Sequence, residues 1–500
     1  MNGNPATLIP VALFLLLGLG ITFFVRYQSR KRRETGFVSE YFIGSRSLGA
    51  FVLAMTTIAT YGSVSSFVGG PGQAWNVGFG WVYMATIQVT ALFLLYGIMG
   101  KKMALVSRKL GAITVIDVIR ARYQSNALAN ISAIVIVLFF GATMVAQFVG
   151  GAKLFEAVTG YSYEVGLAIF GIAAILFTAL GGFRGVAFVD TLCGIAMIVG
   201  IFVLAGGILN AGGGYTNIME NLQTHNSQLL DPLGGGDMPI GLYFTQWLLV
   251  GVFTFCLPQS VVRCMGYKDS KSLRQAMIIG TIIIGAMMIG VTALGVLAKG
   301  ILPADLSAYG NSVDNIIPLA IVQSLPPWLA GVAIIGPVAA SISTVASLLI
   351  FSSSSIIKDM YLHYREEKND VPSGKQVARY SQVFTFVVGV IVFVLSVVPP
   401  DVIWKINMFA FGGLETAFCW VLVMGLFWKK ANKIGALCST VGGTLAYCGT
   451  MAAGITFFGL HQIVIGITIS LLCMVVGSLV VSSKATSEKE KEIRLVFFGE

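Results

Sequence analysis

The chain has 500 residues, of which 56% are apolar and only 11% are charged, and its mean hydropathy is strongly positive. This composition lies far outside the usual range of soluble domains and excludes a soluble globular protein. We therefore expect a polytopic membrane protein whose helices cross the lipid bilayer.

A helix needs about 20 mostly apolar residues to cross the roughly 30 Å hydrocarbon layer of a bilayer. Stretches of this kind predict an all-α fold with about 13 transmembrane helices. The hydrophilic stretches between them are too short to build an independent core, so we expect one transmembrane domain over residues 1–500. The predicted helices are 7–25, 48–70, 79–99, 127–152, 163–180, 186–208, 240–263, 275–298, 328–355, 378–398, 403–428, 434–457 and 462–482.

The distribution of basic residues predicts the orientation of the chain. No Lys or Arg precedes the first predicted helix and a basic cluster at 26–33 follows it, which indicates a retained helix and not a cleaved signal peptide. With the N-terminus outside and the C-terminus in the cytoplasm, all but three of the 32 Lys and Arg residues fall on the cytoplasmic side. The exceptions are Lys153, Lys299 and Lys405. The net charge of +10 thus reflects orientation in membrane lipid, and nucleic acid is not an expected partner.

The residues most often used in catalysis and metal binding are scattered. The seven cysteines lie in or at the ends of predicted helices without a CxxC pair, and the three histidines lie in loops or at a helix edge. Structural disulfides, metal clusters and histidine-based catalysis are therefore not expected. We predict that the chain is not an enzyme and has no cofactor.

Two predicted helices are interrupted by sequence that breaks a helix. Helix 48–70 is unusually polar and runs into Gly-Gly-Pro-Gly at 69–72, and helix 240–263 contains Pro258. Paired broken helices at membrane depth mark the midplane site of secondary transporters, where irregular backbone lines a cavity. The two lie five predicted helices apart, as inverted repeats would require. The polar residues at the breaks that we expect to contact a solute are Tyr61, Ser63, Ser66, Gln259 and Ser260.

Helix 328–355 contains a candidate ion site. Ser343 and Thr344 are adjacent hydroxyls in an otherwise apolar stretch, and Ala340 lies one turn earlier. Sodium prefers about five or six oxygen ligands, which hydroxyls, carboxylates and carbonyls freed at helix breaks supply. The alternative is that the two hydroxyls bond back to the preceding turn or serve as small packing residues.

Three further polar residues lie inside predicted helices. Asp190 follows Arg184 at the cytoplasmic start of helix 186–208, where it either pairs with that arginine, caps a helix or lines the ion path. Glu415 lies near the middle of helix 403–428 without an evident partner, so its role is open between the ion path and structure. Gln147 is a candidate solute contact, with the alternative that it joins neighbouring helices.

In its motifs the chain resembles the sodium:solute symporter family along its whole length. The stretches that carry the resemblance are EYFIGSRS at 40–47, FTALGGF at 177–183 with Asp190-Thr191, Ser343-Thr344, and KDMY at 358–361. Other stretches are similar to the bacterial family members that transport pantothenate. These are ATYGSVSSF at 59–67 followed by GGPG, ARYQS at 121–125, QFVGGA at 147–152 and GYKDSK at 266–271.

The resemblance implies a LeuT-like core of two inverted five-helix repeats, at 48–208 and 240–428. An extra helix and a cytoplasmic loop precede the core in 1–47, and two helices in 429–482 and a cytoplasmic tail at 483–500 follow it. The resemblance also implies sodium-coupled import of a small organic anion, pantothenate, by alternating access in the bacterial inner membrane. The implied sodium ligands are the carbonyls of Ala59, Gly62 and Ala340 and the hydroxyls of Ser343 and Thr344.

One position bears on the substrate. Proline-transporting relatives carry an aspartate where this chain has Tyr61, and a buried aspartate beside a substrate carboxylate would cost several kcal/mol of repulsion. Tyrosine therefore favours an anionic substrate, although sugar carriers of the family also lack that aspartate. Proline, a sugar or a short monocarboxylate stay open as substrates. Two different classes of protein also stay open, a transporter-like sensor with appended signalling domains and an ion-independent carrier.

Overall fold

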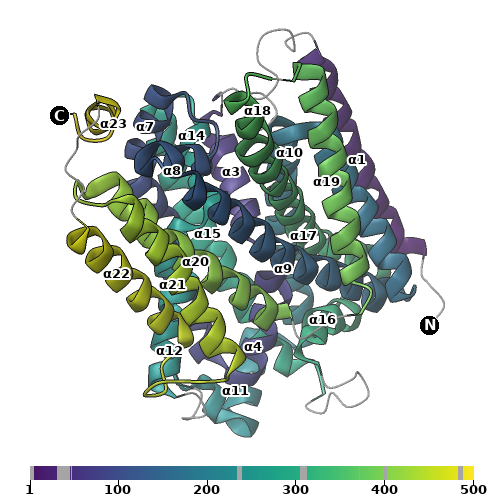
Figure 1. The fold of residues 1–500 in the computed structure, drawn as a ribbon. Helices are drawn as coiled ribbons and strands as arrows, with labels where there is room; N and C mark the ends of the chain where they lie inside the picture. The colour runs from purple at the N-terminus through teal and green to yellow at the C-terminus, as the bar shows by residue number, and fades with distance from the viewer. Residues whose placement is uncertain are drawn as a thin grey trace.

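The computed structural model describes residues 5–30, 46, 48–233, 239–303, 312–370, 372–398, 403–481 and 488–499. Within these ranges the regular secondary structure is helical, as predicted, and the long helices form one bundle (Figure 1). The predicted basic loop at 31–45, most of the motif at 40–47 and the start of the tail at 482–487 lie outside the described residues.

Most of the bundle consists of long apolar helices. Five shorter segments between Phe79 and Leu110 follow one another and together form another long apolar stretch, Phe79–Leu110. The long helices are α1 (Pro5–Arg30), α9 (Asn126–Thr159), α10 (Tyr163–Ala211), α15 (Ser270–Leu297), α17 (Pro327–Ile356), α19 (Gly374–Leu395), α20 (Ile403–Phe427), α21 (Lys433–Ala452) and α22 (Gln462–Val480).

Two membrane-length segments are broken, as predicted, but only the second breaks at the predicted residue, next to Pro258. In the first segment the break lies at residues 62–64, and the glycines and proline at 69–72, where the interruption was expected, are helical. The first consists of α3 (Ala50–Tyr61), η2 (Ser65–Gly69) and α4 (Gly70–Val77), and its two halves are bent by 62°. The second is bent by 42° at Leu257. Its segments are α12 (Ile240–Trp247), η7 (Leu248–Val252), η8 (Phe253–Cys256), α13 (Pro258–Val261) and α14 (Arg263–Gly266).

Helix occupies each of the thirteen predicted stretches, but α10 runs through two of them. Residues 163–180 and 186–208 were expected as separate helices, and α10 consists of two helices that meet at a kink at Gly182. There φ is 59° and ψ is −173°, a backbone conformation that is essentially confined to glycine. The number of membrane crossings and the division into repeats stay predictions.

Short helices gather at the two ends of the bundle (Figure 1). At the upper end in that view the segment before α3 pairs with the segment after α14, because Leu48 N donates to Gly266 O and Lys268 N donates to Leu48 O. The helices at this end are α7 (Lys101–Leu110), α8 (Val115–Tyr123), α14, α18 (His363–Glu367) and α23 (Glu488–Phe498). Those toward the opposite end are α4, α11 (Tyr215–His225), α12 and α16 (Ile316–Ser324).

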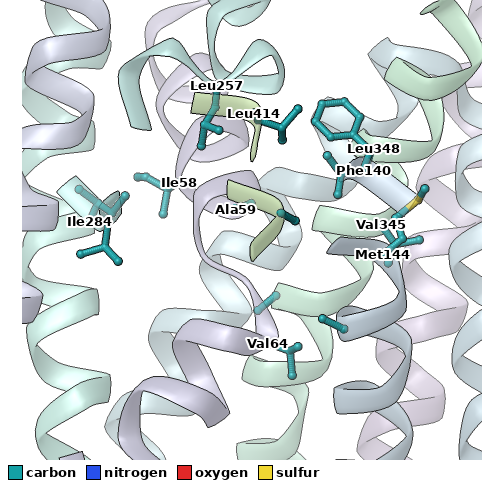
Figure 2. Packing of buried hydrophobic residues seen from close by; sticks show 14 of the residues in the cluster. Ile58, Ala59, Val64, Phe140, Met144, Leu257, Ile284, Val345, Leu348 and Leu414 are labelled. Atoms are coloured by element: carbon teal, nitrogen blue, oxygen red, sulfur yellow. The ribbon is translucent and has the colours of Figure 1, made fainter. Parts of the chain in front are cut away.

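The broken helices lie in the centre of the hydrophobic core. Figure 2 shows Ile58, Ala59 and Val64 of the first broken segment among side chains from the surrounding helices, including Phe140 of α9 and Val345 of α17. α17 is the most enclosed of the long apolar helices, with 94% of its most apolar stretch buried. The core therefore surrounds the breaks, where polar backbone groups would otherwise be exposed to lipid.

Candidate functional site

The break in the first segment frees two carbonyl groups. α3 ends at Tyr61, and Gly62 is extended, with φ −69° and ψ 113°. The N–H of Gly62 still bonds to Ile58 O at 2.7 Å, and the next helical segment begins at Ser65. The carbonyls of Ala59 and Gly62 therefore point to side chains of another helix instead of continuing the helical ladder.

These carbonyls meet the hydroxyl pair of α17. Ser343 Oγ lies 2.7 Å from Ala59 O and 3.2 Å from Ala340 O. Thr344 Oγ1 lies 2.9 Å from Ala340 O and 3.4 Å from Gly62 O. All five residues are buried, and the structure thus brings together the five oxygen atoms that were expected from the family resemblance as sodium ligands.

The donor count of this oxygen cluster suits a cation. Apart from the backbone N–H that bonds to Ala340 O within α17, the three carbonyls and two hydroxyls share only two hydrogen atoms, because each hydroxyl has one. Several lone pairs therefore remain without a donor in a buried place, and a hard monovalent cation can satisfy them. Back-bonding within the helix, the alternative to an ion site, describes the contact of Thr344 with Ala340 but not that of Ser343 with Ala59, which joins two helices.

Gln147 of α9 supports the same break from the other side. Its Oε1 accepts a hydrogen bond from Val64 N at 2.9 Å, and its backbone carbonyl accepts one from Ser341 Oγ at 2.7 Å. The Nε2 atom is buried and has no hydrogen-bond partner among the described residues. Gln147 therefore joins neighbouring helices, which was one of its two expected roles, and keeps one free donor.

The second break lies beside the first. Leu257 is extended, with φ −61° and ψ 125°, and Pro258, which has no N–H, begins α13. Tyr61 donates a 2.5 Å hydrogen bond to Val250 O, which ties the end of α3 to η7. Gln259 and Ser260 are buried, and the Oε1 of Gln259 has no partner in the described part of the chain.

The three serines among the predicted solute contacts are not joined to one another by hydrogen bonds in the described part of the chain. Ser63 is buried and Ser66 is half-buried, both at the first break. Among the described residues, no hydrogen bond joins the side chains of Ser63, Ser66 and Ser260 to one another. The structure therefore places the six predicted solute contacts at or beside two neighbouring breaks and leaves their shared role a prediction.

Asp190 has a partner that was not expected from the sequence. Its Oδ2 accepts a 2.6 Å hydrogen bond from Thr56 Oγ1 and lies 3.6 Å from Nη2 of Arg263. Both charged side chains are almost completely buried. The ion partner is Arg263 of α14, so the pairing with Arg184, one of the three roles left open for Asp190, is not the one that the structure shows.

Arg263 was expected at the cytoplasmic end of helix 240–263, but it is a buried, central residue of a polar network. Its guanidinium donates to Gln259 O at 2.5 Å, to Ser347 Oγ at 3.0 Å and also to Thr60 Oγ1. The neighbouring sequence could have indicated its burial, because two valines precede Arg263 and a cysteine and a methionine follow it. Counting basic residues on each side of the membrane cannot detect an arginine that is buried inside the helix bundle.

Glu415 lies on α20 and is completely buried. Within the described residues, neither of its carboxylate oxygens has a hydrogen-bond partner. No partner for this carboxylate was evident from the sequence either. Sequence and structure therefore both indicate an isolated acid.

Broken helices around a buried oxygen cluster define a secondary transporter. The profile of the "Sodium:solute symporter family" matches residues 41–443, and the chain belongs to that family. It is a multi-pass protein of the bacterial inner membrane, it uses sodium as the coupling ion, and it is a transporter and not an enzyme.

Individual relatives extend over nearly the whole chain. The sodium/pantothenate symporter of Escherichia coli (strain K12) is 41% identical over 94% of this chain and 96% of its own length. The protein of the same name from Haemophilus influenzae is 39% identical over 95% of this chain and 96% of its own length. A solved structure of a Na+-coupled sialic acid symporter, in a substrate-bound outward-open state, covers 97% of this chain and 99% of that chain with a TM-score of 0.81. At 19% identity this likeness concerns the fold.

Proposed function

We propose that the protein imports pantothenate, or a closely similar small organic anion, together with sodium. The observation that carries this proposal is the identity of 39–41% with two sodium/pantothenate symporters over nearly the full length of each. Similarity over this length includes both broken helices, where a solute would bind.

The oxygen cluster supports a sodium site between the first broken segment and α17. Its oxygen atoms come from two helices that alternating access would move relative to each other. A sodium ion bound there would hold α3 against α17, because it adds bonds to both. We therefore propose that sodium binding favours the conformation that admits the substrate. The ligands are the carbonyls of Ala59, Gly62 and Ala340 and the hydroxyls of Ser343 and Thr344.

We propose that the substrate binds against the two breaks. Pantothenate carries a carboxylate, an amide and two hydroxyls, so it needs donors and acceptors from the protein. The Nε2 of Gln147 offers a donor and the Oε1 of Gln259 offers an acceptor, since neither has a partner among the described residues. Tyr61 brings no negative charge to this place, which favours an anion. Ser63, Ser66 and Ser260 complete the proposed contacts.

We propose that the N-terminus lies outside and the C-terminus in the cytoplasm. Basic residues of α7 and α8 gather at the same end of the bundle as the C-terminal helix α23 (Figure 1), and basic segments stay in the cytoplasm. We also propose that 48–208 and 240–428 are inverted repeats, since each has a break in its first helix.

Competition identifies the substrate. Purified protein in proteoliposomes with an inward sodium gradient takes up labelled pantothenate, and unlabelled compounds are added in excess. We expect unlabelled pantothenate to abolish the uptake, whereas proline, a sugar and a short monocarboxylate leave it unchanged. Inhibition by proline together with uptake of labelled proline would show that the substrate is proline and not pantothenate.

A further inference from the structure

Glu415 is a buried acid that the sodium site does not use. We propose that it binds a proton that enters with the substrate, as a second cation site separate from the sodium site. This inference rests on the proposed import of an organic anion. It begins from the complete burial of the side chain and from the absence of any hydrogen-bond partner for either carboxylate oxygen within the described residues.

In the part of the chain that the structure describes, the immediate surroundings of Glu415 offer no positive charge. The titratable side chains of that part that face it belong to four elements, and all are phenols or thiols. They are Tyr61 of α3, Cys256 of η8, Cys419 of α20 and Tyr447 of α21. An ionised carboxylate buried without a partner carries a large free-energy cost, so this buried arrangement requires the neutral acid.

Charged residues on the other elements that contact α20 lie toward its ends. Lys153 of α9 pairs with Asp314, whose carboxylate contacts Ile403 N at the start of α20, about 18 Å from Glu415 by helical rise. Arg122 of α8 donates to Gly425 O and Trp428 O, on the far side, about 15 Å or more away.

The remaining charged and titratable residues of α20 and of the elements that contact it also lie away from Glu415. Lys405 of α20 is about 15 Å from Glu415 along the helix. η2 and η7 contain no titratable side chain. In α8 the other charged residues engage η12 (Ile357–Leu362), where Arg120 donates to the carbonyl of Asp359 and Asp117 pairs with Lys358. The α22 residue Cys473 faces Gly442 of α21.

The ligand set favours a proton over a second sodium ion. Both phenol hydroxyls already donate elsewhere, Tyr61 to Val250 O at 2.5 Å and Tyr447 to Met408 O at 3.1 Å. The other neighbours are thiols, which are poor ligands for a hard cation. A sodium ion needs about five or six oxygen ligands, whereas a proton needs only one oxygen atom.

The position of Glu415 links proton binding to closure around the substrate. Its helix packs against η8, and Figure 2 shows Leu414, the preceding residue, near Leu257 at the second break. Tyr61 comes from the first break. While the cavity is open, water hydrates the ionised carboxylate. Closure removes this water and brings an anion near, so both steps favour the protonated acid.

The proposal changes the charge that moves in each cycle. One sodium ion with one monovalent anion moves no net charge, whereas the added proton makes the cycle carry one positive charge inward. Uptake then responds to membrane potential and to external pH. In the range where Glu415 is ionised in the open state, the apparent substrate affinity rises by up to about tenfold for each unit that the pH falls.

The test compares wild type with Glu415→Gln, which fixes the neutral form. Proteoliposomes with an inward sodium gradient and an internal pH indicator report pantothenate and proton entry together, over a range of external pH. We expect wild type to bring in one proton per substrate and Glu415→Gln to bring in none and to lose the pH dependence of affinity. The exposed Glu156→Gln serves as the control and should match wild type.

Three results overturn the proposal: no proton entry in wild type, an unchanged pH profile in Glu415→Gln, or proton entry that persists in that variant. If Glu415→Gln does not transport, proton uptake is measured on adding pantothenate to the solubilised proteins in weak buffer. Wild type should then take up a proton when it binds pantothenate. A Glu415→Gln protein that still binds pantothenate should take up none. Sodium-driven uptake without protons refutes this inference alone, whereas a lack of pantothenate uptake refutes the proposed function.

Discussion

Asp190 and Arg263 form a buried ion pair that joins α10 to α14, with 3.6 Å between Oδ2 and Nη2. The guanidinium also contacts Thr60 and Ser347, which follow the proposed sodium ligands by one residue and by about one turn of helix. The pair therefore fixes the backbone around the oxygen cluster from the side of α14.

Removing one member of this pair should destabilise the protein strongly. Asp190→Asn leaves a buried guanidinium without its counter-charge, which typically costs about 3–5 kcal/mol. We expect a clear fall in the thermal unfolding temperature of the purified protein, and partial recovery in Asp190→Asn combined with Arg263→Met. The control is Asp370→Asn, which breaks the exposed pair with Arg365 and should have little effect. Equal behaviour of the two single variants would contradict this role.

The hydroxyls of α17 should determine sodium affinity. Ser343→Ala and Thr344→Ala each remove one of five proposed oxygen ligands, with an expected loss of about 1–3 kcal/mol, or roughly 5- to 150-fold in affinity. The measurement is the sodium concentration that gives half-maximal pantothenate uptake. Ser352→Ala is the matched control, since Ser352 is buried on the same helix and its hydroxyl has no partner among the described residues. A shift of similar size in the control would argue against the assignment.

Tyr61 should influence both closure and the choice of substrate. Tyr61→Phe removes the hydrogen bond to Val250 O, which is worth about 0.5–1.5 kcal/mol, so uptake should fall by roughly 2- to 12-fold. Tyr61→Asp adds a negative charge and should lower the affinity for pantothenate more than that for its neutral amide. Titration with both compounds measures this ratio. An equal loss for the two would show that charge at this position does not select the substrate.

The kink of α10 should depend on glycine at one position. Gly182→Ala places a side chain at φ 59°, with an expected cost of about 1–3 kcal/mol. Gly185 is helical, and a Cβ there would meet no atom within 4 Å, so Gly185→Ala should be neutral or mildly stabilising. Thermal unfolding of the two purified variants compares them directly. A stable Gly182→Ala variant would mean that α10 can straighten without loss.

The sequence predicted those features of the fold and site that depend on neighbouring residues in the chain. Apolar length predicted the helices, and Pro258 predicted the second break, because proline acts on the backbone where it stands. The first break was expected in the right helix but at 69–72, and it lies at 62–64, because glycine and proline at the start of a helical segment do not interrupt it. The hydroxyl pair on α17 was also visible, since Ser343 and Thr344 are polar in an apolar stretch.

Contacts between distant segments required the structure. Nothing in the sequence joins Asp190 to Arg263, which are 73 positions apart, and a count of charges by loops placed the arginine in the cytoplasm. The carbonyls of Ala59 and Gly62 came only from the family resemblance, because a backbone oxygen leaves no mark in the sequence. For Glu415 the sequence showed an acid in a helix, and the structure added its isolation.

The most direct test of sodium-coupled import is labelled pantothenate uptake into proteoliposomes that contain the purified protein. With sodium outside and choline inside, we predict transient accumulation above the external concentration. This accumulation should disappear when choline replaces the external sodium and in the variant that combines Ser343→Ala with Thr344→Ala. Equal uptake in sodium and in choline, with no effect of the double substitution, would contradict the account.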